Sequence, residues 1–351
     1  MKKKDVINLI KYHMEQNDPA FRSEATQIAR DFDQKGDSDL AEYIMGLLST
    51  TNTLVPQSFD EELSYFEKMD HNKEMLLFPD TITHELTGIM NAIMHNMGVN
   101  KFLFVGKPGT GKTEAVRHLG RILKREVLMV EFSQVIDSKL GQTQKNITDL
   151  FHQMNHFPAP KTLIILFDEI DALALDRTNA NDVREMGRAT STLLKGLDHV
   201  HDDLVIIATT NLYKYLDQAL LRRFDAIVNF DCYSKEDLLK IAEKLSNDYM
   251  NKYKIGNRDI RLFRKIVKLA LEDHEYMPAE LKNRIKTSIA FSDLNDPNDY
   301  YRRLYVTLTN KSITDEETLR KQGFTVREIA VLIGSSKSSV ARKLQEGEND
   351  E

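Results

Sequence analysis

The sequence predicts an α/β protein, in which a parallel sheet carries helices on both faces and helical units stand before and after the sheet. Two observations support this fold class. Five short apolar runs alternate with helical patterns between residues 76 and 232, namely "FLFVG", "VLMVEF", "TLIILFDE", "DLVIIATT" and "AIVNF". Strand-like runs that alternate with amphipathic helices are typical of parallel sheets, because a crossover helix returns the chain to the same end of the sheet. In addition, a glycine-rich stretch, "GKPGTGKT", separates the first run from the next helical pattern.

Composition narrows the class of protein. The chain has 351 residues, of which 41% are hydrophobic and 29% are charged, enough apolar material for two or three domains. The net charge of -6 argues against a protein that coats nucleic acid along its whole length, and the single cysteine, Cys232, excludes a disulfide framework within one chain and a cysteine metal site. Lys11, His13 and Glu15 interrupt the apolar segment that a signal peptide needs, and no run reaches the roughly 18 apolar residues of a membrane helix. We therefore expect a soluble, cytoplasmic protein without a membrane partner.

Changes of pattern divide the chain into seven segments. Short amphipathic helices precede the sheet, helices without strands follow it, and polar stretches lie between these parts. The expected segments are an N-terminal helical domain at 1–55, a linker at 56–75, a large α/β subdomain at 76–232, an all-helical unit at 233–291, a connector at 292–314, a helix-turn-helix-like unit at 315–345 and an acidic tail at 346–351.

The glycine-rich stretch fits the phosphate-binding pattern G-x-x-x-x-G-K-[ST], directly after a strand-like run and directly before the helical pattern "EAVRHLGRIL". Glycines let the backbone curl so that its N–H groups point at phosphate oxygens, and the following helix adds its positive end. Lys112 can then reach the β- and γ-phosphates, and the Thr113 hydroxyl can bind Mg²⁺. The flanking strand and helix argue against an ordinary glycine-rich turn. The predicted nucleotide-binding residues are Gly106, Lys107, Pro108, Gly109, Thr110, Gly111, Lys112 and Thr113.

Acidic and amide side chains follow two of the later strand-like runs. "LIILFDEIDAL" is apolar on both strand faces and ends in Asp168 and Glu169, where open α/β sheets bind ligands. We expect Asp168 to hold Mg²⁺, partly through water, and Glu169 to orient and deprotonate the attacking water. Asn211 ends the run "ATTN", where its amide can contact the γ-phosphate or that water, although Asn also suits the N-cap of a helix over "LYKYLDQALL". Together these residues predict ATP and Mg²⁺ as cofactors.

The motifs "GKPGTGKT", "LIILFDEIDAL", "ATTN" and "LDQALLRRFD" resemble, in order and approximate spacing, those of AAA+ ATPases over roughly residues 76–291. The short form "RRFD" is similar to that of the katanin and spastin branch of the AAA group. The resemblance implies a P-loop AAA+ core over 76–232 with a helical lid at 233–291. It also implies a homo-oligomeric ring or spiral, commonly hexameric, with ATP sites between subunits.

The resemblance implies roles for two further places in the chain. Arg222 and Arg223 would act as fingers that reach the γ-phosphate bound by the neighbouring subunit, where a guanidinium stabilises the transition-state charge. The alternative is a solvated basic helix end balanced by Asp225. In the lid, "MPAELKNRI" resembles the AAA group's small-residue version, with Ala279 where many AAA+ proteins have a nucleotide-contacting arginine. We interpret Arg284, five residues on, as a solvated helix arginine.

The segment "VIDSKLGQTQKNITDLF" resembles the pore loop with which protein-remodelling AAA ATPases grip a threaded polypeptide. The corresponding residues are Lys139, Leu140 and Gly141. Leucine can press on a substrate chain but cannot stack on it as an aromatic residue would. The alternative is a lysine-bearing loop that leads into a helix. "LDRTNANDVREMGRA" would form a second loop facing the pore.

The segment "TVREIAVLIGSSKSSVARKL" has the layout of a helix-turn-helix, with Ala330 small at the helix crossing and Gly334 in the turn. Between Arg320 and Leu344 there are six basic residues and one acidic residue, so DNA is a candidate partner. The alternative is a helical hairpin that packs against the ring or binds a partner protein. The candidate DNA-contacting residues are Ser336, Lys337, Ser339, Arg342 and Lys343.

The N-terminal stretch "DPAFRSEATQIARDFDQKGDSDLAEYI" resembles the leading segment of AAA ATPases encoded beside a subtilisin-like serine protease, in bacterial modules linked to plasmid incompatibility and phage defence. That resemblance implies a protease partner; the alternative is a plain helical adaptor domain. We therefore expect a ring-forming ATPase that remodels or threads a protein substrate, with a protease partner and recruitment to DNA. A DNA-transaction ATPase, such as a transposition or replication regulator, and an ATP-gated scaffold with little motor activity are the alternatives.

Overall fold

The computed structural model describes residues 8, 11–12, 18–33, 40–41, 44–45, 65–70, 77–136, 141–172, 180–253, 259–293 and 295–349. The chain forms two compact units, 1–64 and 65–351. In the first unit, helix α2 (Asp18–Asp33) buries Ala25, Ile28 and Ala29 on one side, as the amphipathic pattern of its sequence predicts.

The second unit contains a six-stranded sheet in the order β1-β3-β4-β5-β2-β6. The five predicted apolar runs form its five parallel strands, which confirms the expected fold class. Strand β1 pairs antiparallel with β3 at one edge. It was not predicted, because two charged residues carry no alternation of apolar and polar side chains. The strands are β1 (Glu67–Lys68), β2 (Lys101–Val105), β3 (Glu126–Glu131), β4 (Leu163–Asp168), β5 (Val205–Thr210) and β6 (Ala226–Asn229).

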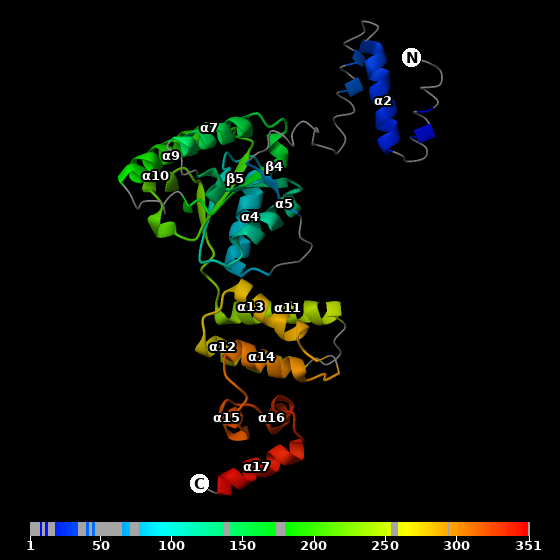
Figure 1. Ribbon diagram of the computed structural model, residues 1–351, viewed down its shortest axis with the longest axis vertical. Coiled ribbons are helices and arrows are strands. Elements are labelled where there is room, and N and C mark those ends of the chain that lie inside the picture. Colours follow the sequence, from blue (N-terminus) through cyan, green and yellow to red (C-terminus); the bar gives the residue numbers. More distant parts are fainter. Residues whose placement is uncertain are drawn as a thin grey trace. The chain divides into compact units, whose positions relative to one another are not determined.

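Helices cover both faces of this sheet (Figure 1). Alternate strand residues, such as Phe102 and Phe104 of β2, share one core with α4 and α5. Residues of opposite orientation face the other helices, where Phe167 of β4 packs edge-on against Phe132 and Phe151. Burial on both faces explains why these strands are continuously apolar. The elements on or near the sheet are α4 (Asp80–Met94), α5 (Lys112–Leu123), α6 (Phe132–Val135), α7 (Gln142–Asn155), η1 (Pro160–Thr162), α9 (Ala180–Asp198), η2 (Tyr213–Tyr215) and α10 (Gln218–Leu221).

Among the described residues that follow the sheet, the regular elements are all helices. Helix α14 falls in the predicted connector, but it packs against α12 and α13 and buries Tyr300, Tyr301 and Tyr305 in the same core as they do. These helices are α11 (Lys235–Tyr253), α12 (Ile260–Asp273), α13 (Pro278–Ala290), α14 (Asp299–Thr309), α15 (Glu316–Lys321), α16 (Val326–Ile333) and α17 (Lys337–Asn349). Helix α17 thus continues into the segment expected as an acidic tail.

The last three helices are joined to α12 and α14 by buried contacts. Phe324 and Ile329 belong to the same apolar core as the lid helices, and Phe324 packs edge-on against Tyr305. Lys265 of α12 donates to Glu328 of α16 at 2.7 Å. The helix-turn-helix assignment stays a prediction, but α15 to α17 pack as one body with α12 and α14.

Among the helices in the described ranges, none is both long enough and apolar enough to cross a bilayer. The expected cytoplasmic location stays a prediction.

Candidate functional site

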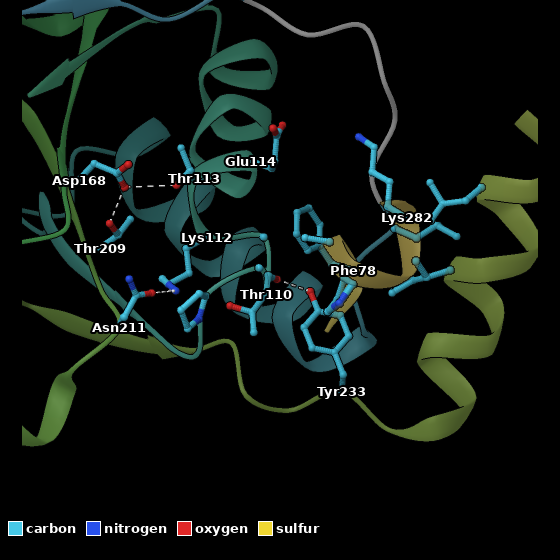
Figure 2. Close-up of a pocket in the computed structure, with 18 of the residues that line it drawn as sticks. Phe78, Thr110, Lys112, Thr113, Glu114, Asp168, Thr209, Asn211, Tyr233 and Lys282 are labelled. Atoms are coloured by element: carbon cyan, nitrogen blue, oxygen red, sulfur yellow. Dashed lines mark hydrogen bonds between the residues drawn. The ribbon is translucent and has the colours of Figure 1, made fainter. Parts of the chain in front are cut away.

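A cavity of about 340 Å³ lies where the carboxyl ends of β4 and β5 meet the loop that follows β2. Residues of α11 and α13 close its other side, so the cavity lies between the sheet and the lid helices (Figure 2). The carboxyl ends of neighbouring parallel strands lie at the same edge of a sheet, which is why three distant motifs of the sequence meet here.

The glycine-rich loop 106–113 curls through left-handed backbone conformations. Gly109 has a φ of 80° and Gly111 a φ of 94°, which residues with a Cβ rarely adopt. A Cβ at Gly109 would also come within 3.1 Å of the Ala279 Cβ. Gly111 caps α5 without a side-chain hydrogen bond, so the first N–H groups of this helix keep their capacity to bind an anion.

Lys112 is 7% exposed, and its ammonium group donates three hydrogen bonds inside the site. The acceptors are the carbonyl oxygens of Gly106 (2.6 Å) and Lys107 (3.0 Å) and the amide oxygen of Asn211 (2.8 Å). Burial lowers the pKa of Lys112 below its usual value, while the carboxylates of Asp231 and Asp168 act in the opposite direction. The Lys112 ammonium group therefore lies in the cavity wall and donates only to neutral acceptors.

Asp168 at the end of β4 accepts two hydroxyl hydrogen bonds on one oxygen. The Thr113 hydroxyl donates to its Oδ1 at 3.2 Å, and the Thr209 hydroxyl donates to the same oxygen at 2.6 Å. Figure 2 shows the three side chains together beside Lys112. Hard oxygen atoms of a carboxylate and a hydroxyl are the ligand set that Mg²⁺ prefers, so these residues fit the predicted ion.

Glu169 follows with a backbone φ of 53°, in the left-handed region. Its backbone N–H donates to the Thr209 hydroxyl at 3.0 Å, and its carboxylate accepts from the Asn211 amide at 3.3 Å. Asn211 therefore contacts both Lys112 and Glu169. The N-cap alternative for Asn211 is wrong, because Leu212 caps the short 3₁₀ helix η2 and Asp217 caps α10.

Apolar and aromatic side chains line the part of the cavity away from the strands. Phe78 lies near Gly111, and the ring of Phe78 also packs against Phe230. Tyr233 and Ala279 face the cavity from the lid side. Sequence reasoning missed most of this wall, because its members come from separate segments without a shared pattern. Among all residues that line the cavity, on the strand side as well as the lid side, those missed are Leu77, Phe78, Glu114, Thr209, Tyr233, Ile241, Lys244, Leu245, Pro278 and Lys282.

Three hydrogen bonds from the end of the sheet and from the lid hold the glycine-rich loop. The Asp231 carboxylate accepts the Lys107 N–H at 2.7 Å, and the Tyr233 hydroxyl donates to the Thr110 carbonyl at 2.7 Å. The Ala279 N–H donates to the Gly109 carbonyl at 3.0 Å. Burial raises the pKa of the Tyr233 phenol well above its ordinary value, which keeps the phenol as a donor. None of these three bonds uses the N–H groups of Gly109 to Thr113.

Comparison with known proteins identifies the family. The model of the ATPase family associated with various cellular activities (AAA) matches residues 102–232. An uncharacterized AAA family ATPase, y4kL, of Sinorhizobium fredii (strain NBRC 101917 / NGR234) is 30% identical over 234 residues, which cover 61% of this chain and 70% of that protein. The chain belongs to the AAA ATPase family. It is accordingly an ATP hydrolase.

Other AAA relatives are longer than this chain. The vesicle-fusing ATPase of Arabidopsis thaliana is 30% identical over 227 residues, covering 62% of this chain and 29% of that protein. The proteasome-activating nucleotidase of Methanoregula boonei (strain DSM 21154 / JCM 14090 / 6A8) is 30% identical over 208 residues, which cover 54% of this chain and 47% of that protein. The chain thus spans less than half of the length of these two relatives. A crystal structure of the FIGL-1 AAA domain in complex with ADP matches 78% of this chain and 97% of that one, with a TM-score of 0.50 and 18% identity, and so shares its fold.

The two arginines expected as fingers in this AAA ATPase have different surroundings. Arg223 forms a two-pronged ion pair with Asp198, with both N–O distances 3.1 Å, and also donates to the Ala219 carbonyl. Arg222 is exposed, and its guanidinium has no partner among the described residues. The alternative interpretation, a basic helix end whose charge Asp225 balances, is wrong about Asp225. The Asp225 carboxylate accepts hydrogen bonds from the backbone N–H groups of residues 100 and 101 instead.

Arg284 in the lid is not a solvated arginine, so that interpretation was wrong. Its guanidinium donates to Glu280 at 3.1 Å and to Asn310 at 3.2 Å, and lies 5.1 Å from the ring centre of Tyr276. Arg284 does not line the cavity. It also donates to the Thr307 carbonyl, so it fastens α13 to the end of α14.

The described residues of the remaining predicted sites do not line the cavity. Lys139 and Leu140 of the expected pore loop lie outside the described residues, as does the start of the second loop, whereas Gly141 caps α7 with a φ of 78°. On α17, Lys343 pairs with Glu316 at 2.8 Å and Arg342 lies 3.7 Å from Glu346. Ser336 accepts the N–H of Ser339 at 3.2 Å, and Lys337 is exposed.

Proposed function

We propose that this AAA ATPase hydrolyses ATP between the subunits of a ring, most simply a hexamer, and uses the free energy to remodel or thread a protein substrate. One observation carries the intersubunit site. In the part of the chain that the structure describes, the cavity lining contains lysines but no arginine, and Arg222 is exposed without a side-chain partner. Phosphoryl transfer spreads negative charge over the γ-oxygens, and an arginine from a second subunit can stabilise it.

The loop residues Gly109 to Thr113 would receive the phosphates on their N–H groups. Lys112 would exchange its bonds to the Gly106 and Lys107 carbonyls for phosphate oxygens, because an ammonium binds a charged acceptor more strongly than a neutral one. Thr113 and Asp168 would hold Mg²⁺, Asp168 partly through water; the ion neutralises phosphate charge when bound.

Glu169 would act as the general base. It takes a proton from the attacking water, the water oxygen bonds to the γ-phosphorus, and the bond to the bridging oxygen breaks to release ADP and phosphate. Asn211, which contacts Glu169 at 3.3 Å, would orient the water or the γ-phosphate without adding charge. Phe78 and Tyr233 would enclose the base of the nucleotide, with Ala279 leaving room beside the loop.

Protein remodelling is supported by the relatives and by the sequence. The relatives include a vesicle-fusing ATPase, a proteasome-activating nucleotidase and peroxisomal ATPases. Lys139, Leu140 and Gly141 would form the loop that grips the substrate. Membership of the katanin-like branch rests on "RRFD" at 222–225, and a serine protease partner rests on the N-terminal segment.

Recruitment to DNA would use the exposed face of α17. Lys337 is the cation of this face with no partner among the described residues, whereas Arg342 and Lys343 lie near carboxylates of their own chain. These pairs would have to open before both side chains bind phosphate, so a partner-docking role for the same helices remains the alternative to DNA.

A mixing experiment tests the intersubunit site. Arg222→Ala should bind ATP but lower kcat by about 10³-fold. Adding Lys112→Ala chains, which cannot bind ATP but carry an intact Arg222, should restore part of the activity. The matched control is the double variant Lys112→Ala/Arg222→Ala, which offers neither a pocket nor a finger and should restore nothing. Arg223→Ala should lower kcat less, because Arg223 is held by Asp198 in its own chain.

Two results would return Arg222 to a surface role. One is the absence of rescue in assemblies that light scattering shows to contain both chains. The other is a wild-type protein that keeps its full turnover per chain at dilutions where it is monomeric.

A further inference from the structure

The hydroxyl of Thr209 lies between the two acidic residues of the ATP site. Thr209 is 1% exposed at the end of β5. Its hydroxyl donates to Asp168 Oδ1 at 2.6 Å and accepts the Glu169 backbone N–H at 3.0 Å. A threonine hydroxyl has one proton to donate, so both functions of this hydroxyl are engaged by the acidic pair.

Thr209 also supports the unusual backbone of Glu169. Residue 169 has a φ of 53°, a conformation that side chains other than glycine rarely adopt without surrounding support. The N–H of Glu169 is bound by the Thr209 hydroxyl, and the N–H of Ile170 is bound by the Thr209 carbonyl at 3.0 Å. Two successive N–H groups of the turn after β4 therefore end on one residue of β5, and this determines the direction in which the Glu169 side chain leaves the strand.

The same hydroxyl sets the orientation of Asp168. With Thr209 and Thr113 both donating to Oδ1, the other carboxylate oxygen, Oδ2, accepts no hydrogen bond within the described residues. That oxygen is the one left for a cation or for the water that binds it. One hydroxyl thus couples the carboxylate expected to hold Mg²⁺ with the carboxylate expected to act as base.

The surroundings give no structural need for a hydroxyl on this side chain apart from these partners. Every residue of β5 is buried, and its neighbours Ile206, Ile207 and Ala208 are apolar. A buried hydroxyl without partners is unfavourable, and valine has nearly the same shape as threonine and a stronger preference for an apolar interior. The hydroxyl is therefore explained by what it does to Asp168 and Glu169.

We propose that Thr209 is a positioning residue for ATP hydrolysis, whose hydroxyl holds Asp168 and Glu169 in one arrangement relative to the bound nucleotide. It does not touch the reacting atoms and acts through the two carboxylates. This inference rests on the proposed roles of Asp168 and Glu169.

The test compares Thr209→Val, which removes the hydroxyl at nearly constant shape, with Thr209→Ser, which keeps it. Thr209→Val should lower kcat by about tenfold or more, because a hydrogen bond to a charged group is lost, and should leave KM for ATP within about twofold. Thr209→Ser should recover kcat to within about threefold of the wild type.

A binding measurement provides a readout that does not depend on turnover. In EDTA, a fluorescent ATP analogue should bind Thr209→Val as tightly as it binds the wild type. The Mg²⁺ concentration that gives half of the maximal Mg²⁺ effect on binding should be several-fold higher for Thr209→Val.

The matched control is Thr210→Val, which removes the neighbouring buried hydroxyl. The Thr210 hydroxyl accepts the Leu212 N–H at 3.0 Å and touches neither carboxylate. Thr210→Val should change neither kcat nor the Mg²⁺ dependence by more than about twofold.

Several outcomes would overturn the proposal: Thr209→Val with normal kcat and Mg²⁺ dependence, Thr209→Ser as slow as Thr209→Val, or Thr210→Val with the same kinetic profile. If Thr209→Val does not fold, Thr209→Ser and Thr209→Ala are compared instead, since they differ only by the oxygen atom. Glu169→Gln is measured in parallel. If it hydrolyses ATP within a few-fold of the wild type, the base assignment fails together with this inference. If it is inactive while Thr209→Val is normal, only the role of Thr209 fails.

Discussion

Lys112 in the cavity and three lysines in the helical part of the same unit have different kinds of partner. Lys112 donates to two backbone carbonyls and one side-chain amide, all of which are neutral. In the helical part, lysines pair with carboxylates: Lys265 with Glu328 at 2.7 Å, Lys311 with Asp273 at 2.7 Å and Lys343 with Glu316 at 2.8 Å. All four lysines are hydrogen-bonded, but only the three in the helical part are in direct contact with a carboxylate that neutralises their charge.

The difference has a consequence for ligand binding. An ammonium held by neutral acceptors has no carboxylate in direct contact. Burial lowers the pKa of Lys112, although the nearby carboxylates of Asp231 and Asp168 act in the opposite direction. A phosphate oxygen can replace those acceptors and add an attraction between opposite charges. A lysine already paired with a carboxylate gains little from the same exchange. The type of partner therefore separates a cation kept for a ligand from one that stabilises the fold.

Lys112→Met and Lys265→Met test this comparison with the largest expected effect. Lys112→Met should weaken ATP binding by about 10²-fold or more, since at least two charge-assisted hydrogen bonds to phosphate are lost. Its urea unfolding midpoint should change little. Lys265→Met should leave ATP affinity within about twofold and lower stability by about 1–3 kcal/mol, because Glu328 loses its cation. Fluorescent-nucleotide titration and urea unfolding measure the two quantities.

Equal effects of the two variants on ATP affinity would break the distinction. So would a Lys112→Met protein that is destabilised as much as Lys265→Met, because Lys112 would then be a structural cation as well.

Tyr233→Phe sharpens the comparison at the glycine-rich loop. It removes the hydrogen bond to the Thr110 carbonyl, which helps to hold the loop in its ligand-ready shape. We expect about a fivefold weaker Kd for ATP, equivalent to one hydrogen bond of about 1 kcal/mol. Tyr276→Phe is the control, because the Tyr276 hydroxyl donates to the Leu308 carbonyl of α14 and not to the loop. It should lower the thermal unfolding midpoint without changing the Kd, and a Kd shift as large as that of Tyr233→Phe would show that the effect is not specific to the loop.

The pair between Lys265 and Glu328 predicts the smallest effect, a dependence of stability on pH. Burial acts to raise the pKa of Glu328, but the hydrogen bonds from Lys265 and Thr325 outweigh it and leave the pKa below the ordinary value. Because the folded-state pKa is the lower one, this contribution is fully present above the unfolded-state pKa of about 4.3 and is lost as the pH falls through the folded-state value. Wild type should thus lose more urea stability than Glu328→Gln between pH 6 and pH 3. Parallel losses in the two proteins would contradict it.

Contiguous patterns of the sequence were sufficient for much of this fold and part of the site. Five apolar runs predict the five parallel strands, and "GKPGTGKT" between a strand and a helix predicts the loop, because each depends on neighbouring residues. The rule that ligands bind at the carboxyl ends of parallel strands then predicts that Lys112, Asp168, Glu169 and Asn211 meet at one edge, and they do.

Tertiary structure alone decided the partners of these residues. Thr209 reaches Asp168 across 41 positions, Tyr233 reaches Thr110 across 123, and Asp231 reaches the N–H of Lys107 across 124. The packing also decides that Arg223 is paired with Asp198 while Arg222 is not, although the two arginines are adjacent in the sequence. Local patterns carry the backbone preferences and the buried faces of single elements, whereas a side-chain hydrogen bond depends on which elements the complete fold brings within about 3 Å of each other.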